Sequence, residues 1–125
     1  MRRIGLGLGV AAAIALAGCM TAEAPTSGEF RQITTAAEFT EMLAGRDMLF
    51  GEDVIRFSGN RFAAFRNGEL RTTATWSFEN GQYCRAGQFV DGRPLARDCQ
   101  VVEIRGDEIR FTRGDGSVGT GRLVG

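Results

Sequence analysis

The chain has 125 residues, of which 24% are charged; its formal net charge is zero and its basic residues are all arginine. This length suits one small domain, and the lack of a basic excess argues against a nucleic-acid partner. Histidine is absent, which excludes Ser-His-Asp and Cys-His nucleophile systems and removes the commonest metal ligand. We therefore expect no catalytic site, no metal site and no cofactor.

Residues 1–18 have the features of a secretory signal peptide. Arg2 and Arg3 precede an uncharged run that extends to Ala17, as in the basic and apolar regions of such signals. A membrane-spanning helix needs about 20 apolar residues, and this run is shorter and rich in Gly and Ala. We therefore expect the segment to direct export and then to be removed.

The signal ends in Leu16-Ala17-Gly18-Cys19, which resembles the lipobox of bacterial lipoproteins. The resemblance implies that signal peptidase II cuts before Cys19, that its sulfur carries a diacylglyceryl group, and that its amino terminus is acylated by a fatty acid such as palmitate. In such lipoproteins Asp at the next position favours retention in the inner membrane. Met20 stands there, which implies an outer-membrane anchor facing the periplasm. Alternatively, Ala15-Leu16-Ala17 fits ordinary secretion of a soluble protein.

The mature chain divides into two parts. Residues 19–32 are rich in small and polar residues and are expected to form a lipidated tether. Residues 33–125 are expected to form one short helix followed by an antiparallel β-domain. Thr35 and Glu38 match a capping box, which predicts an amphipathic helix over about Ala36 to Ala44 that packs on this domain.

From Leu49 onward, short strand-like segments are separated by turn residues. Asn67-Gly68 and Asn80-Gly81 are hairpin signals, and apolar and polar side chains alternate between these two turns. The expected strands are Val54–Ser58, Arg61–Arg66, Leu70–Glu79, Gln82–Ala86, Gln100–Ile104, Glu108–Thr112 and Ser117–Leu123. They predict a mainly β fold, an antiparallel meander that closes or nearly closes into a small barrel. A flat open sheet is the alternative, although its long edges would favour aggregation.

Two cysteines remain once Cys19 is assigned to the lipid. Cys84 and Cys99 would meet an oxidising compartment, where disulfides persist, and we expect them to form one. Closing a loop of this length stabilises a small domain by about 3 kcal/mol. A redox-active or metal-binding pair is the alternative, although the close C-x-x-C spacing is missing.

Candidate functional residues are few. The stretch Ala86 to Ala96, between the cysteines, is the one obvious interaction loop, and its candidate contact residues are Gln88, Val90, Arg93, Pro94 and Leu95. The acidic residues Glu52-Asp53, Asp98 and Asp107-Glu108 could supply a catalytic carboxylate pair, but adjacent acidic residues are more typical of solvated turns. The many aromatic residues could line a ligand cavity or simply fill the barrel.

Three segments resemble a family of small secreted Gram-negative proteins. They are Trp76-Ser77-Phe78-Glu79-Asn80-Gly81-Gln82-Tyr83-Cys84-Arg85, Asp98-Cys99-Gln100-Val101-Val102 and Arg110-Phe111-Thr112-Arg113-Gly114-Asp115-Gly116. The resemblance implies a disulfide between Cys84 and Cys99 and carries over no catalytic residue. Some members are labelled dihydrodipicolinate reductase, but this chain has neither the motif nor the length for that enzyme's nucleotide-binding domain.

We therefore expect a membrane-anchored periplasmic lipoprotein of the cell envelope that acts as a non-enzymatic binding or structural module. Its expected partners are the membrane, through the lipid anchor, and an unidentified envelope protein or ligand. An inhibitor of a periplasmic or foreign hydrolase such as lysozyme is the second hypothesis. A carrier of a small hydrophobic ligand is the third.

Overall fold

The computed structural model describes residues 28–125. The expected signal peptide, Cys19 and most of the tether lie outside these residues. The described residues form nine strands and one helix. These elements are β1 (Arg31–Ile33), α1 (Ala36–Leu43), β2 (Asp47–Phe50), β3 (Asp53–Ser58), β4 (Arg61–Arg66), β5 (Glu69–Glu79), β6 (Gln82–Phe89), β7 (Pro94–Arg105), β8 (Glu108–Thr112) and β9 (Val118–Val124). No helix among them is long and apolar enough to cross a membrane.

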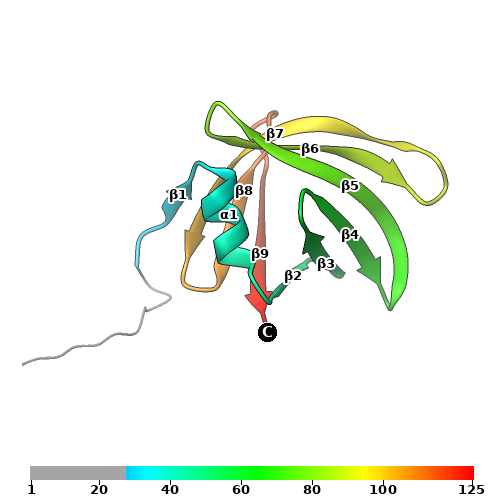
Figure 1. The fold of residues 1–125 in the computed structure, drawn as a ribbon, viewed down its shortest axis with the longest axis horizontal. Coiled ribbons are helices and arrows are strands. Elements are labelled where there is room, and N and C mark those ends of the chain that lie inside the picture. The colour runs from blue at the N-terminus through cyan, green and yellow to red at the C-terminus, as the bar shows by residue number, and fades with distance from the viewer. Residues whose placement is uncertain (1–27) are drawn as a thin grey trace, which may run out of the picture.

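The strands form a closed barrel. Strands β7, β6, β5, β4, β3, β2, β9 and β8 pair in this order, and β8 pairs back with β7, which completes an eight-stranded antiparallel barrel (Figure 1). The short strand β1 is an addition that pairs with the C-terminal part of β7, where Gln32 lies opposite Glu103. The predicted antiparallel barrel is confirmed, and the open-sheet alternative is wrong.

Two tight turns set the register of the central strands. Asn67 and Gly68 have φ angles of 53° and 79°, and Asn80 and Gly81 have φ angles of 55° and 78°. Positive φ at both central residues is the conformation that matches the twist of a two-residue hairpin, and Asn-Gly is the pair that best adopts it. The sequence signal for both hairpins is therefore confirmed. The resulting pairing of β5 turns its alternating apolar side chains into the barrel.

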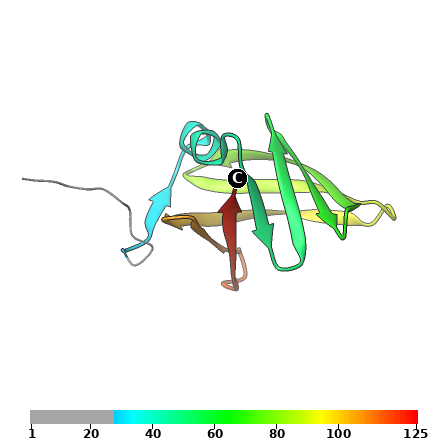
Figure 2. The ribbon, with the colours of Figure 1, turned by 90° about the horizontal axis from the view of Figure 1, so that it is seen from below.

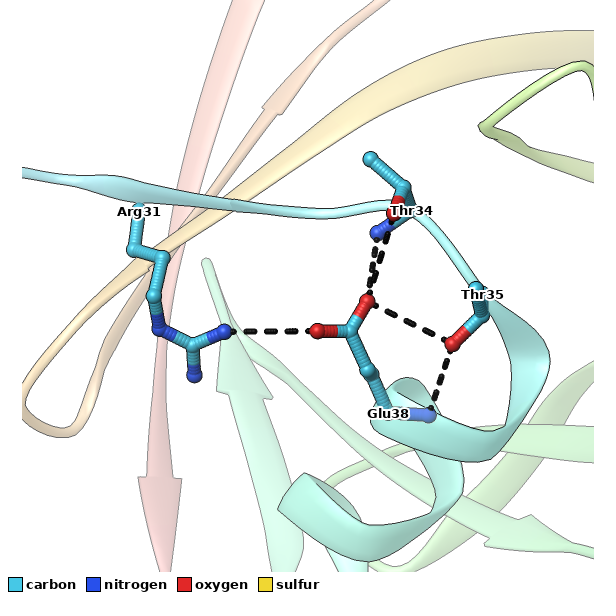
Figure 3. A network of polar contacts seen from close by, with 4 residues as sticks. All are labelled: Arg31, Thr34, Thr35 and Glu38. Atoms are coloured by element: carbon cyan, nitrogen blue, oxygen red, sulfur yellow. Dashed lines mark hydrogen bonds and ion pairs between the residues drawn. The ribbon is translucent and has the colours of Figure 1, made fainter.

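The helix starts at the predicted capping box. Thr35 is the N-cap, and its hydroxyl accepts a hydrogen bond of 3.1 Å from the backbone N–H of Glu38 (Figure 3). The Glu38 carboxylate accepts hydrogen bonds from the backbone N–H of Thr34 at 3.1 Å and from the Thr35 hydroxyl at 3.3 Å, and it faces Arg31 at 3.5 Å. These contacts satisfy groups that a helix start leaves without partners and join α1 to β1.

One end of the barrel is closed by α1. Phe39 is fully buried, and its ring centroid lies 5.0 Å from those of Trp76 and Tyr83 and 5.4 Å from that of Phe57. Burial of a large aromatic residue among other aromatic rings stabilises both the helix and the barrel wall. The tip of the β6–β7 hairpin lies far from α1 in both views (Figures 1 and 2). We call the α1 end the closed end and the opposite end the mouth.

Three segments differ from the expectation. β1 falls partly within the expected tether, and β2 lies before the first expected strand, Val54–Ser58; both are short strands that pair with strands distant in the sequence. The stretch Ala86 to Ala96, expected to be a loop, is mostly strand, because β6 continues to Phe89 and β7 begins at Pro94. The two glycines and the proline of this stretch weaken the sequence signal for a strand. The stretch is nevertheless mostly strand, because its residues pair with neighbouring strands.

Candidate functional site

A cavity of about 100 Å³ lies inside the barrel and reaches the mouth. Its walls are apolar and mostly aromatic, whereas its polar lining residues come from β6, β7 and the residue after β8. The lining residues are Met48, Phe50, Ile55, Phe57, Phe62, Tyr83, Arg85, Gln100, Phe111 and Arg113. An apolar cavity with a few converging polar groups is the usual form of a small-molecule site.

Two arginines flank this cavity at the mouth. Arg85 follows Tyr83 by two residues on β6, so both side chains point into the barrel. Arg113 lies directly after β8, where its Nη1 donates to the Ser117 hydroxyl at 3.3 Å. Arg85 Nη1 donates to the backbone carbonyl of Ala96 at 2.5 Å. Both guanidinium groups are therefore held at the cavity entrance by neutral acceptors.

The ion pairing of these two arginines differs from that of most others in the domain. Eight of the thirteen arginines between residues 28 and 125 form an ion pair with a carboxylate at 3.5 Å or less. Among the described residues Arg61, Arg71, Arg85, Arg113 and Arg122 form none. Three of these five are exposed to solvent, whereas Arg85 and Arg113 are half-buried. A half-buried cation loses hydration and gains most from an anionic partner.

Two buried polar side chains complete the cavity. Tyr83 and Gln100 are 4% and 5% exposed, and they face each other across β6 and β7. Burial raises the pKa of the Tyr83 hydroxyl, while the nearby charge of Arg85 acts in the opposite direction. The hydroxyl is therefore protonated at neutral pH and can act as a hydrogen-bond donor. Gln100 Nε2 donates to the Asp98 carboxylate at 2.9 Å.

A glycine on β9 makes room for the mouth residues. A Cβ atom on Gly119 would lie 2.5 Å from the Phe50 ring and 2.7 Å from the Arg113 guanidinium. Side chains at this position would therefore displace one of the two groups. The absence of a side chain at Gly119 lets Phe50 and Arg113 occupy the same part of the entrance.

The predicted disulfide lies beside the mouth. Cys84 and Cys99 are joined and face each other directly across β6 and β7. They are adjacent in sequence to Arg85 and Gln100, whose side chains point to the opposite face, into the barrel. The disulfide therefore connects the two strands that present three of the four polar lining residues, and the expected pairing is confirmed.

The acidic residues considered for catalysis are in part held in ion pairs. Asp53 pairs with Arg66, Asp107 pairs with Arg46, and Glu108 pairs with Arg105, with N–O distances of 2.8 to 2.9 Å. These carboxylates lie on separate turns and strand ends, and the structure does not bring them together at the cavity. Residues 28–125 contain no cluster of three or more potential metal-ligating side chains.

The candidate interaction residues lie along the β6–β7 hairpin. Val90 is 62% exposed at its tip. Asp91 accepts hydrogen bonds from the Arg93 backbone N–H at 3.0 Å and from its Nε at 2.8 Å, and the Arg93 guanidinium lies 4.4 Å from the centre of the Phe89 ring. The tip is thus held by its own side chains. The remaining candidates lie on the paired strands, where Gln88 faces Pro94 and Leu95 faces Gly87.

The chain enters the domain at the closed end. The Phe30 ring lies between the guanidinium groups of Arg105 and Arg110, which are 4.3 and 3.8 Å from its centre. Such cation–π contacts attach the segment before β1 to the outside of β7 and β8. Arg105 and Glu108 flank the β7–β8 turn, which lies at the other end of β8 from Arg113. The tether therefore joins the domain at the end away from the mouth.

Comparisons of the chain with models of protein families, with curated proteins and with solved structures find no match. The geometry of the mouth is therefore the main guide to function. Sequence reasoning did not identify Arg85 and Arg113 as site residues. The available signal was the position of Arg85 two residues after Tyr83 on a strand, which places a charge on an otherwise apolar inner face.

Proposed function

We propose that this chain is a lipid-anchored periplasmic protein of the cell envelope whose β-domain is a non-catalytic binding module. The mouth of the barrel is its binding site. The observation that carries this proposal is the apolar cavity flanked by the half-buried cations Arg85 and Arg113. A barrel needs neither feature to be stable, because its core is otherwise made of apolar side chains.

The position of the tether supports an orientation in which the mouth faces away from the membrane. Phe30 lies eleven positions after Cys19, so a lipid at Cys19 would keep the domain within about 40 Å of the bilayer. The tether joins the closed end, and the mouth would then face away from the outer membrane into the periplasm. A ligand or the exposed part of an envelope protein would reach it there.

The size of the cavity limits what it binds. Typical small-molecule pockets measure about 300–1,000 Å³, whereas this cavity measures about 100 Å³. A carrier that encloses a whole lipid does not fit these dimensions. A small apolar group that enters from the mouth does fit, with the rest of the ligand outside the barrel.

Methyl groups in the cavity allow a direct test of this proposal. Met48 and Ile55 line the cavity, whereas Ile33 and Leu43 are buried near α1. Pentanol and pentanoate would be titrated into the mature chain carrying Cys19→Ala while methyl resonances are followed by NMR. We expect the Met48 and Ile55 methyls to shift with saturation while those of Ile33 and Leu43 do not. Unchanged Met48 and Ile55 methyls with both compounds would contradict the proposed binding site.

The lipid anchor has an independent test. Cells expressing the wild-type chain or Cys19→Ala would be labelled with a radioactive fatty acid. We expect label on the wild-type protein and none on the variant, with the wild type in the outer-membrane fraction. Label that persists in the variant would show that Cys19 is not the acylated residue.

Inhibition of a hydrolase such as lysozyme is the second candidate function. The observation that favours it is the side-chain-supported hairpin tip with Val90 exposed, since an inhibitor needs a rigid projection that enters an active site. The matched control is Val118, which is 55% exposed at the start of β9, compared with 62% for Val90. If the tip inhibits, Val90→Asp abolishes inhibition of lysozyme and Val118→Asp preserves it. Absence of inhibition by the wild-type chain, or equal loss in both variants, would reject this function.

A further inference from the structure

We propose that the mouth selects a carboxylate that carries an apolar group of three to four carbons. The carboxylate lies between Arg85 and Arg113, and the apolar group enters the cavity. This inference rests on the proposed binding function and adds the chemical class of the ligand. The inference is drawn from the two charged side chains at the entrance and from the volume and the apolar lining of the cavity behind them.

The charge of the ligand follows from the two arginines. Arg85 and Arg113 line both the cavity and the adjoining depression formed by the β7 and β8–β9 segments. Guanidinium groups hydrogen-bond carboxylates in a planar, often bidentate geometry, and these charge-assisted bonds are stronger than neutral ones. Among the described residues, each of the two arginines donates one hydrogen bond, through Nη1, to a neutral oxygen. The other N–H groups of each guanidinium remain for a ligand.

The carboxylates nearest the mouth accept hydrogen bonds from groups other than Arg85 and Arg113. Asp98 accepts hydrogen bonds from the Gly114 backbone N–H at 3.2 Å and from Gln100 at 2.9 Å. Asp115 accepts from the Ser117 backbone N–H at 2.9 Å. Neither forms an ion pair with a described arginine within 4 Å. Asp98 lies opposite Arg85 on the neighbouring strand, so these carboxylates reduce the local positive potential, but neither occupies a guanidinium group through an ion pair.

The size of the apolar group follows from the cavity. An apolar cavity of about 150 Å³ accommodates benzene, and one water-sized group occupies about 30 Å³. A cavity of about 100 Å³ therefore accommodates three or four carbon-sized groups. Phe50, Phe57 and Phe111 form much of its wall, which suits an unbranched or singly branched alkyl group.

Two sources present this chemistry. A short-chain fatty acid such as pentanoate has four carbons beyond its carboxylate. The C-terminal leucine of a protein presents a four-carbon side chain beside a free carboxylate. Both place the charge at one end of a short alkyl group, and a comparison of their affinities distinguishes them.

The experiment compares matched ligands on the mature chain carrying Cys19→Ala. Trp76 is the single tryptophan of the chain, and its ring centroid lies 6.1 Å from that of Tyr83 in the cavity wall. Its fluorescence therefore reports on the cavity, and calorimetry gives an independent affinity. The ligands are pentanoate against pentanol, and the peptide Ala-Ala-Leu with a free carboxylate against the same peptide with a C-terminal amide.

We expect a carboxylate to bind about tenfold more tightly than its neutral counterpart in at least one of the two pairs. Arg85→Met and Arg113→Met remove this preference, whereas Arg122→Met, an exposed arginine without an ion pair among the described residues, retains it. Preference within the fatty-acid pair alone identifies a free acid, and stronger preference within the peptide pair identifies a protein C-terminus.

Three other results would overturn the inference, in distinguishable ways. If the neutral and charged members of each pair bind equally well, the mouth binds apolar groups without regard to charge, and only the ligand class is wrong. If none of the four compounds binds, the proposed binding function fails as well. A preference that survives in both Arg85→Met and Arg113→Met would place the carboxylate elsewhere. Thermal denaturation of each variant establishes that it is folded.

Discussion

The two ends of the barrel differ in how fully side chains fill the interior and in whether nearby arginines pair with carboxylates. At the closed end Phe39 of α1 fills the interior and packs against four aromatic residues. Near that end Arg46 pairs with Asp107 at 2.9 Å and Arg105 pairs with Glu108 at 2.8 Å. At the mouth a cavity remains, and Arg85 and Arg113 have no described carboxylate partner. The closed end is therefore filled by its own side chains, and the mouth is the end at which we propose that an external partner binds.

This contrast explains how one small domain can combine a stable scaffold with the proposed binding site. Binding sites need groups held in place before the ligand arrives. The disulfide, the Gly119 contact and the neutral hydrogen-bond acceptors hold the mouth residues without neutralising them. On our proposal, stability depends mainly on the closed end and the strand pairing, and ligand recognition depends on the mouth.

The largest expected effect comes from opening the closed end. Phe39→Ala removes a fully buried ring and should lower the free energy of unfolding by about 3–5 kcal/mol, measured by urea denaturation. Arg113→Met at the mouth should change it by less than about 1 kcal/mol. Equal destabilisation by the two variants would show that Arg113 is part of the scaffold and would remove the contrast between the ends.

Removal of the disulfide tests how the mouth is held. The pair Cys84→Ala/Cys99→Ala opens a link with a sequence separation of 15, which should cost about 3 kcal/mol of unfolding free energy. Urea denaturation with and without reductant measures it. Reductant should destabilise the wild type and leave the double variant unchanged. A reductant effect on the variant, or none on the wild type, would contradict this role.

A smaller effect is expected at the start of α1. Thr35→Ala removes the N-cap hydroxyl and should lower the free energy of unfolding by about 1 kcal/mol. Thr40→Ala is the matched control, because Thr40 is exposed within the same helix and alanine is the better helix former. The measurement is urea denaturation of both variants. A loss at Thr40 as large as that at Thr35 would mean that the cap contributes little.

The smallest effect is a dependence on pH at the same cap. The hydrogen bond from the Thr34 backbone N–H, supported by those from Thr35, lowers the pKa of Glu38 below its ordinary value of 4.5. A lowered folded-state pKa stabilises the fold above the unfolded-state pKa and loses this effect as the pH falls through the folded-state pKa. The melting temperature of the wild type should therefore exceed that of Glu38→Gln at pH 7. The difference should shrink below pH 4.5, and a constant difference would contradict the assignment.

The features that could be predicted from the sequence are those that depend on neighbours along the chain. Thr35 and Glu38 predict the start of the helix, and the two Asn-Gly pairs predict hairpins. Each of these conformations depends only on residues a few positions apart in the chain. The three-residue strand β1 carries no such signal, since its pairing partner lies about 70 positions away on β7. The mouth requires barrel closure as well, because Arg85 and Arg113 come from β6 and the β8–β9 turn and meet only in the folded domain.

The most direct test of the central claim is the location of a bound ligand. NMR would record nuclear Overhauser effects between the terminal methyl of pentanoate and the side chains of the mature chain carrying Cys19→Ala. Our account predicts contacts with Met48, Ile55 and Phe111 in the cavity and none with Phe39 or Leu43 at the closed end. Contacts with α1 and none with the cavity residues would contradict it.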